Sequence, residues 1–306
     1  MKSWITSGFA PAVLLLVPVV ALVLAGCQAE PDHQRFTSSV SAPGAPDADF
    51  NAELETAIAS GNPELASGRR FSREISGPTV IDRPGHYRVV SDFAVTGAGD
   101  AIVIRADHVS LNLGGHVITG PGNKIGRGIV LDGAEHVLVS NGTLRTFGLA
   151  VALLSTSHSS IRQVTALGGD EFADPPNGVP PQIGIMLINS FRNRLTDNDL
   201  RLVNLGIFVR GGGSYENRIS RNRVVGGAMG LLAICYNPAP NEGDTGPMRD
   251  DIRRNVLSRF SGGIQTSAGS AHNRFVSNVI YYFDFAWQDN NGSNKFEDNE
   301  TMQVSR

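Results

Sequence analysis

The sequence of 306 residues contains few charged residues, and acidic residues slightly outnumber basic ones. Charged residues make up 18% of the chain and aromatic residues 7%, and the formal net charge is -3 at pH 7. Proteins that bind nucleic acid need an excess of Lys and Arg against the phosphates, so this balance argues against a nucleic-acid partner. Low charge and few aromatics together with 35 Gly are typical of a chain with many bends, a thin aliphatic core and little helix.

Long helical patterns are also missing. Between Ala101 and Thr301 no stretch of ten or more residues repeats apolar side chains with helical spacing, which excludes a helical repeat protein. Short segments instead alternate apolar and polar residues and are bounded by Gly, Asn and Ser, as strands are. They include "GIMLI" (184–188), "GIFVR" (206–210), "GLLAIC" (230–235) and "GGIQTS" (262–267).

One phrase recurs between these strands. "ENRISRNRVVGG" (216–227) has relatives in "RNRLTDNDL" (192–200), "DDIRRNVLS" (250–258), "HNRFVSNVI" (272–280) and "SNKFEDNET" (293–301). Steps of 21 to 33 residues between the copies indicate a solenoid, and three short strands per turn predict a parallel β-helix of about eight coils. Asn tolerates a left-handed backbone, and its amide can bond to stacked copies of itself. We therefore expect a ladder of Asn198, Asn222, Asn255, Asn278 and Asn299.

The earlier chain, from "GDAIVIRADHVSLNLGGHVITG" (99–120) onward, has the same pattern of strand and turn. Residues 76 to 304 resemble the right-handed parallel β-helix proteins of the pectate-lyase-like superfamily, and "SLNLGGHVITG" is similar to a phrase that opens many bacterial members. The resemblance implies an all-β fold, a single-stranded right-handed parallel β-helix in residues 76–306. "DFNAELETAIAS" (49–60) has apolar residues on one helical face, which predicts a short N-terminal capping helix within residues 49–75.

The N-terminus indicates a cell-envelope protein. An apolar run ends in "LAGC" (24–27), which resembles the lipobox of bacterial lipoproteins; a permanent membrane anchor is the alternative. The resemblance implies a signal peptide in residues 1–26, lipidation of Cys27, a membrane attachment through that lipid, and a tether in residues 27–48. Gln28 after the cysteine is similar to outer-membrane sorting signals. Cys235 would then be the only thiol, which excludes an intrachain disulfide and a thiolate metal cluster, and we expect it buried at an inward position.

Two insertions, residues 169–182 and 236–251, flank one row of strands and predict a groove between them. Strand alternation, with Ile207, Val209, Leu231, Ala233 and Ile264 inward, sends a mixed aromatic and polar set toward this groove. Such a set suits a sugar chain, although its aromatic members could equally pack beneath the insertions. The expected substrate-binding residues are Phe208, Gln265, Trp287, Asp289, Asp132 and Arg105.

The chemistry that fits this groove is β-elimination from a uronate, which needs a cation against the substrate carboxylate and a base. We predict Arg210, Tyr236 and Arg249 as catalytic residues, and Ca²⁺ at Asp170, Glu171 and Asp174 is the one cofactor the sequence offers. Hydrolysis and uronate epimerisation are alternatives. The catalytic phrases of polygalacturonases, pectate lyases and alginate epimerases are all missing from the sequence.

Histidines recur in turns or strand ends of successive coils, at His108, His116, His136 and His158. We interpret them as surface or ladder residues, because a metal site would need its histidines within one coil.

Two hypotheses follow from the sequence. The first is a monomeric outer-membrane lipoprotein, periplasmic or surface-exposed, that binds and cleaves an acidic polysaccharide as a lyase. The second is a non-catalytic β-helix of the envelope that binds glycan or assists the maturation of a metalloenzyme, as in the β-helix protein of nitrous oxide reductase maturation.

Overall fold

The computed structural model describes Thr56 and residues 72–305, except residues 123–124, 170–181, 228–229, 238–245, 268 and 291. Cys27, the acidic residues Asp170, Glu171 and Asp174, and nearly all of the predicted cap lie outside the described residues. In the part of the chain that the structure describes, no helix is long and apolar enough to cross a membrane.

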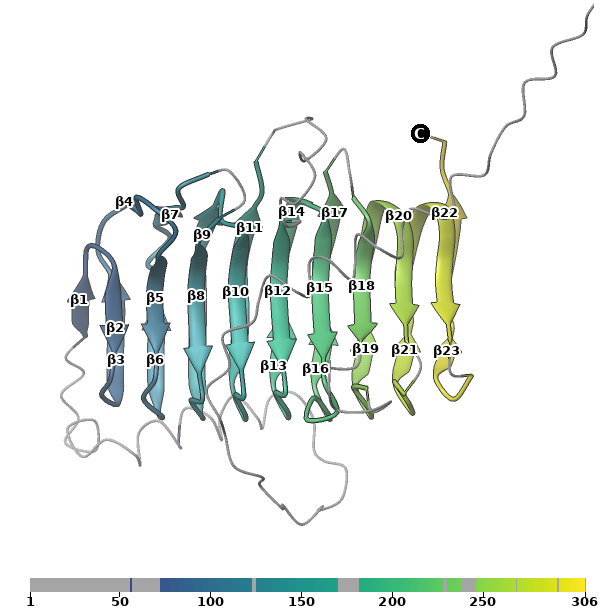
Figure 1. Ribbon diagram of the computed structural model, residues 1–306, viewed down its shortest axis with the longest axis horizontal. Coiled ribbons are helices and arrows are strands. Elements are labelled where there is room, and N and C mark those ends of the chain that lie inside the picture. The colour runs from purple at the N-terminus through teal and green to yellow at the C-terminus, as the bar shows by residue number, and fades with distance from the viewer. Residues whose placement is uncertain are drawn as a thin grey trace, which may run out of the picture. The chain divides into compact units, whose positions relative to one another are not determined.

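The described residues form 24 strands, and every pairing between them is parallel. Each strand pairs with its copies one turn before and one turn after, which is the arrangement of a parallel β-helix of about eight turns (Figure 1). The predicted fold class is confirmed. The strands lie in three rows, here named the first, second and third sheets.

The first sheet contains the strands at the centre of Figure 1, and two long strands join it at the C-terminal end. Its members are β2 (Thr79–Ile81), β5 (Asp100–Ile104), β8 (Arg127–Asp132), β10 (Leu149–Leu154), β12 (Ile183–Ile188), β15 (Leu205–Arg210) and β18 (Leu232–Asn237), with the later parts of β20 (Val256–Thr266) and β22 (Val279–Asp289).

The second sheet follows the first along each turn. It contains β1 (Arg73–Ile75), β3 (Gly85–Val89), β6 (Val109–Asn112), the first halves of β9 (Val137–Arg145) and β11 (Ser160–Leu167), then β13 (Arg194–Thr196), β16 (Arg218–Ser220), β19 (Asp251–Arg253), β21 (Arg274–Val276) and β23 (Lys295–Glu297).

The third sheet closes the turn. It contains β4 (Phe93–Ala94), β7 (Val117–Thr119), the second halves of β9 and β11, β14 (Asp199–Val203), β17 (Arg223–Gly226), the first parts of β20 and β22, and β24 (Glu300–Gln303). Long strands such as β9 and β11 thus run through a bend from one sheet into the next.

The interior is filled by aliphatic residues that stack in columns along the solenoid. One column of the first sheet runs through Ile129, Val151, Ile185, Ile207 and Ile234, all fully buried. Burial of such side chains stabilises the fold by about 1.5–3 kcal/mol each. Because each turn offers the same inward positions to its neighbours, one turn alone cannot bury its apolar face, and the stack is the unit of stability.

The bend between the second and third sheets contains the predicted asparagine ladder, which the structure confirms. The backbone N–H of Asn198 donates to Oδ1 of Asn222 at 3.0 Å, and the N–H of Asn222 donates to Oδ1 of Asn255 at 2.9 Å. The same bonds continue to Asn278 and Asn299. These amides are satisfied by one another in place of water, as buried polar groups must be.

The left-handed backbone is not at the ladder asparagines, which corrects one expectation. It lies one residue earlier, at Asp197, Arg221, Arg254, Ser277 and Asp298, with φ between 50° and 57°. The turn residue therefore bends the chain, while the following Asn turns its amide inward along the stack.

A second ladder occupies the bend between the first and second sheets. It runs through Asn193, Asn217, Asp250, Asn273 and Asn294, with each backbone N–H donating to the Oδ1 of the next side chain at 2.7–3.0 Å. Asp250 is the carboxylic acid in this ladder. Its Oδ1 accepts from the backbone N–H of Asn217 at 2.7 Å, but its buried Oδ2 has no hydrogen-bond partner among the described residues.

Candidate functional site

Some of the predicted groove residues on the first sheet face outward as strand alternation predicts, and others do not. Arg210 faces outward in a column with Asp132, and Nε of Arg105 lies 3.3 Å from Oδ2 of Asp132. Leu154 and Ile188 separate Asp132 from Arg210 in this column, and Arg210 is buried. The predicted cations are therefore on one face but are not brought together.

Phe208 and Gln265 occupy the neighbouring outward column. Phe208 pairs with Met186 and Cys235, and all three are buried, whereas Gln265 donates from Nε2 to Oε1 of Gln288 at 3.0 Å. Burial raises the pKa of the Cys235 thiol to about 12. Cys235 is buried as expected, but it faces away from the core, so its predicted inward orientation is wrong.

The expected orientations of Tyr236, Trp287 and Asp289 are also wrong. Tyr236 is fully buried in the inward column between Val209 and Thr266, so it cannot contact a ligand outside the solenoid. Trp287 pairs with the inward Ile264 and stacks on Phe296, and it is exposed because it belongs to the last turns. Asp289 pairs with Thr266, and its Oδ1 accepts from Thr266 Oγ1 at 2.8 Å.

The errors at Cys235 and Tyr236 come from one residue at the bend before them. Ala233 stands in register with Gly206, and both Ala233 and Ile234 belong to the interior. Two consecutive inward residues shift the alternation by one position, which reverses the side of every residue that follows.

Arg249 does not lie on the first sheet. It belongs to a column of left-handed turn residues between the first and second sheets, with φ 58°. The same column contains Arg192 and Glu216, whose side chains form a salt bridge of 2.8 Å, and it begins with His108, His136 and His158.

These three histidines form a stack on neighbouring turns. The ring centroids of His108 and His136 lie 5.1 Å apart, and those of His136 and His158 lie 5.3 Å apart. Their φ angles are 55°, 55° and 49°, a left-handed conformation in which His is enriched. The ladder interpretation is confirmed, and the stack continues through Phe191 to Tyr215.

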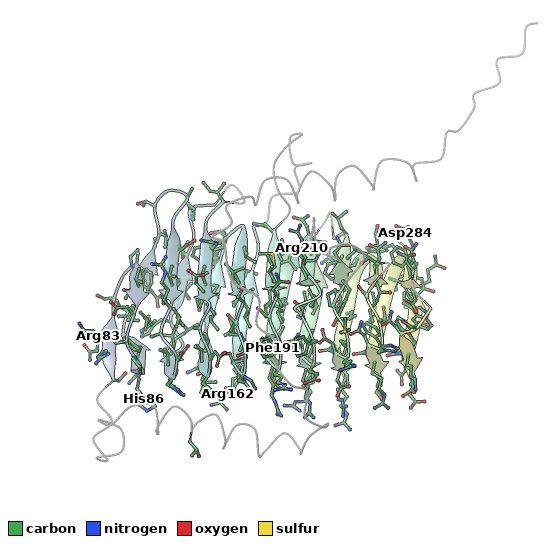
Figure 2. All side chains as sticks on the ribbon, turned by 60° about the horizontal axis from the view of Figure 1, so that its bottom comes forward. Arg83, His86, Arg162, Phe191, Arg210 and Asp284 are labelled. Atoms are coloured by element: carbon green, nitrogen blue, oxygen red, sulfur yellow. The ribbon has the colours of Figure 1, made fainter. Side chains whose placement is uncertain are left out.

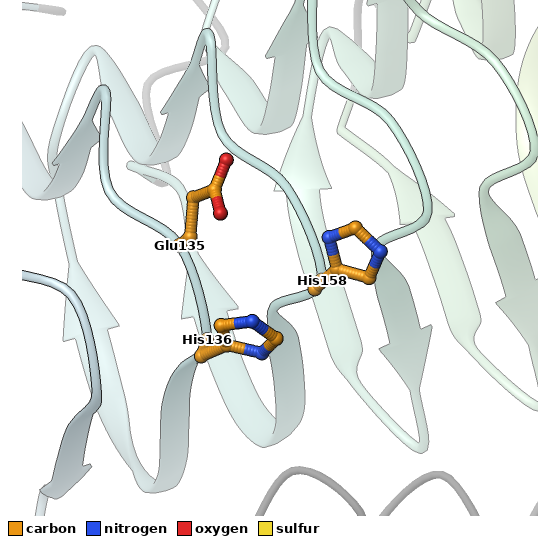
Figure 3. Close-up of side chains that lie close together, drawn as sticks. All are labelled: Glu135, His136 and His158. Atoms are coloured by element: carbon orange, nitrogen blue, oxygen red, sulfur yellow. The ribbon is translucent and has the colours of Figure 1, made fainter. Parts of the chain in front are cut away.

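The stack also contains a set of metal-ligating atoms. One ligand atom each of Glu135, His136 and His158 lies within 4.8 Å of the others. Figure 3 shows the two imidazoles on neighbouring turns, with the Glu135 carboxylate beside them. The argument that a metal site needs its histidines within one coil is thus wrong, because strands of adjacent turns are only about 4.8 Å apart.

Burial and mutual repulsion favour the neutral form of the His136 and His158 imidazoles. Burial lowers the pKa of His136, and the nearby His108 lowers it further. Burial likewise lowers the pKa of His158, with a further contribution from His136. Neutral imidazole is the form that binds metal ions.

The donor set fits a copper ion. Imidazole nitrogen and carboxylate oxygen suit Cu²⁺, which such sites bind most tightly among the divalent first-row metals. Nδ1 of His158 lies 3.2 Å from Ser157 Oγ, which leaves its other ring nitrogen for an ion. Nδ1 of His108 is buried and has no hydrogen-bond partner within the described part of the chain. Ligand bonds of about 2.0–2.2 Å bring the three ligand atoms closer to one another than 4.8 Å. Glu135 is exposed, so its side chain can move toward the two imidazoles.

A second polar feature lies on the second sheet, away from the predicted groove. A cavity of about 150 Å³ opens there between three arginines on β11, on β13 and in the turn after β16. Its lining is Ser160, Arg162, Gln163, Arg194, Thr196, Asp197 and Arg221. In Figure 2, Arg210 is labelled on the upper side of the solenoid and Arg162 on its lower side, in line with their places on different sheets.

Comparison with known proteins identifies the family. Residues 76–304 match the model of the periplasmic copper-binding protein (NosD) family. The chain belongs to the NosD family. This family is described as periplasmic, which agrees with the predicted location in the cell envelope. No curated protein matches the chain significantly.

Several solved structures are similar to the chain at low sequence identity. The Dettilon tailspike protein (gp208) is similar with a TM-score of 0.51 and 15% identity, over 82% of this chain and 58% of that chain. The tailspike protein of E. coli bacteriophage HK620, in complex with a pentasaccharide, has a TM-score of 0.47 and 10% identity, over 80% and 49%. The alginate lyase from Paenibacillus sp. str. FPU-7 has a TM-score of 0.42 and 11% identity, over 69% and 99%. This NosD-family chain thus spans 58% of the length of the Dettilon tailspike that it matches.

Proposed function

We propose that this chain is a non-catalytic periplasmic β-helix that binds copper at the turn formed by Glu135, His136 and His158. The observation that carries the proposal is the convergence of these three ligand atoms within 4.8 Å on adjacent turns. The description of the family as copper-binding supports the choice of metal. Bound at an accessible turn with three protein ligands, the ion would retain open coordination positions through which it can pass to another copper site.

The site is tested by replacing one imidazole without disturbing the turn. Asn favours the same left-handed backbone, so His136→Asn should keep the fold and remove one ligand. We expect its affinity for Cu²⁺ to fall about 100-fold or more, since even the loss of an outer partner of a metal ligand costs about 10–100-fold. The measurement is competition with a chromophoric chelator, using the full chain.

The control variant is His272→Asn. His272 belongs to the same column of left-handed turn residues, with φ 59°, but it lies outside the cluster of Glu135, His136 and His158. Its replacement should leave copper affinity unchanged. Equal affinity of wild type and His136→Asn would disprove the site.

The lyase predicted from the sequence has less support. Of its catalytic candidates, Tyr236 is fully buried and Arg210 is 7% exposed, while Arg249 lies in a separate turn column. These positions favour the non-catalytic alternative. Elimination from alginate or pectate forms an unsaturated uronate that absorbs ultraviolet light, and we expect no such absorbance with the purified chain. A steady rise that depends on enzyme concentration would restore the lyase hypothesis.

We also propose that lipid on Cys27 holds the chain at the outer membrane, on the strength of the lipobox-like "LAGC" sequence. Metabolic labelling with palmitate tests this: label should enter the wild type and be absent from Cys27→Ser, and label in that variant would contradict the assignment.

A further inference from the structure

The ladder between the first and second sheets creates a column of basic side chains. The residue after each ladder member starts a strand of the second sheet. The second residue of each strand faces the core, so the first residue faces outward. Four of the five residues are basic, and all five stand in register on successive turns. In order they are Arg194, Arg218, Asp251, Arg274 and Lys295.

A second outward column lies two residues further along each strand. It runs through Arg162, Thr196, Ser220, Arg253, Val276 and Glu297. Together with Ser160, which precedes Arg194 in the first column, the two columns hold six basic and two acidic residues. This surplus stands out in a chain whose net charge is -3. We name these two columns the basic face.

The cavity described above lies at the N-terminal end of the basic face. Arg221 is fixed at its rim, since its Nε and Nη2 donate to the carboxylate of Asp197 at 2.8 and 3.0 Å. Arg194 is 9% exposed, so its guanidinium is largely shielded from water, where an ionic contact is less screened. Hydroxyls of Ser160 and Thr196 and the amide of Gln163 lie between the cations.

We propose that the basic face binds a linear acidic polysaccharide, with one anionic group held in the cavity. Adjacent strands are about 4.8 Å apart, so the cations repeat along the solenoid and match a polymer with anionic groups on successive sugars. Arginine holds carboxylate and sulfate through paired hydrogen bonds, and the intervening hydroxyl and amide groups suit sugar hydroxyls. A small anion would occupy the cavity alone and would not contact the other cations of the basic face.

The composition of the face argues for a sugar over other polyanions. None of the residues that line the cavity is aromatic, whereas single-stranded nucleic acids are held by stacking of bases on aromatic rings. Val276 is the only apolar residue in the two columns, so the face lacks the apolar side chains that enter a lipid bilayer. The basic face contains none of the residues Glu135, His136 and His158, and its proposed function does not depend on copper.

The test is binding of fluorescently labelled alginate and polygalacturonate to the full chain by microscale thermophoresis. Arg162→Gln combined with Arg218→Gln removes one cation from each column, and we expect affinity to fall about tenfold or more. Arg145→Gln is the matched control, because Arg145 is an exposed arginine on the third sheet, and it should bind as the wild type does. Added salt should weaken binding of the wild type more than that of the double variant.

A gain-of-charge variant keeps the test decisive if the double variant folds poorly. Asp251 interrupts the column between Arg218 and Arg274, so Asp251→Lys should tighten binding about threefold or more. Unchanged affinity in both variants would overturn the proposal, as would equal binding of neutral dextran. Binding to phosphatidylglycerol vesicles but to neither polysaccharide would overturn it in favour of a membrane surface. Loss of binding in Arg145→Gln would show that binding is not specific to the basic face and would overturn the proposal.

Discussion

Asn222→Leu should lower the free energy of unfolding by about 3–5 kcal/mol, which is large for a single polar residue. Asn222 lies in the middle of the ladder between the second and third sheets and is 1% exposed. Its Oδ1 accepts from the backbone N–H and Nδ2 of Asn198 at 3.0 and 2.9 Å, and its Nδ2 donates to the carbonyl of Leu195 and to Oδ1 of Asn255.

Leucine matches Asn in size closely enough to fill the space but supplies neither donor nor acceptor. The N–H of Asn198 and the carbonyl of Leu195 would remain buried without a partner, and each buried unsatisfied group costs about 1–3 kcal/mol. The loss should appear as a lower midpoint in urea denaturation. Asn112→Leu is the matched control, because Asn112 is exposed at the end of β6, and it should cost less than about 1 kcal/mol. Equal losses for the two variants would contradict the role of the ladder.

Asp250→Asn should have the opposite effect and stabilise the protein at neutral and alkaline pH. Asp250 takes the place of an Asn in the ladder between the first and second sheets, beside the buried hydroxyl of Tyr236. The ladder Asn residues use their Nδ2 as a donor, for instance from Asn217 to the carbonyl of Ser190 at 2.9 Å. A carboxylate has no donor, so Asp250 fits this position only when it is protonated.

Burial raises the pKa of Asp250 from its ordinary value of 3.8 to about 7, although hydrogen bonds from the backbone N–H and Nδ2 of Asn217 oppose the rise. The folded state therefore binds the proton more tightly than the unfolded state. The contribution of Asp250 to stability is complete below about pH 4, is lost as pH rises toward 7, and changes little above that. The loss amounts to about 4 kcal/mol, since one pKa unit corresponds to about 1.4 kcal/mol.

The measurement is the difference in unfolding free energy between Asp250→Asn and wild type from about pH 4 to about pH 8. The difference should grow in favour of the variant across this interval. Asn273→Asp, which puts a second carboxyl into the same ladder, should add a further decline toward high pH. A difference that stays constant with pH would show that Asp250 does not titrate in the folded chain.

Much of the fold could be predicted because the repeat is periodic. Asn recurs one turn apart, so its spacing gives both the length of the turn and the residues of the ladder. The place of Asn222 in the ladder could be predicted from this spacing alone. The side that each strand residue faces was harder to predict. In the strand from Leu232 to Asn237, two consecutive inward residues, Ala233 and Ile234, break the alternation, and this break depends on how tightly the bend packs against Gly206.

The candidate sites were missed for a related reason. His108, His136 and His158 are 28 and 22 residues apart, about one turn each, so the period itself could have placed them side by side. The basic face was visible in the repeated pairs Asn193–Arg194, Asn217–Arg218 and Asn273–Arg274. The two insertions begin and end at strands of the first sheet, and the predicted site was therefore placed there rather than at the histidine turn or the basic face. The cavity between Arg162, Arg194 and Arg221 depends on three turns at once, which no local pattern encodes.

Copper coordination at the histidine turn is tested most directly by pulsed electron paramagnetic resonance of the chain loaded with one equivalent of Cu²⁺. Imidazole ligands produce nitrogen modulations whose depth reports how many rings bind the ion. We predict a pattern from His136 and His158 together in the wild type and from a single imidazole in His136→Asn. A wild-type spectrum without imidazole nitrogen, or a pattern that His136→Asn leaves unchanged, would contradict the account.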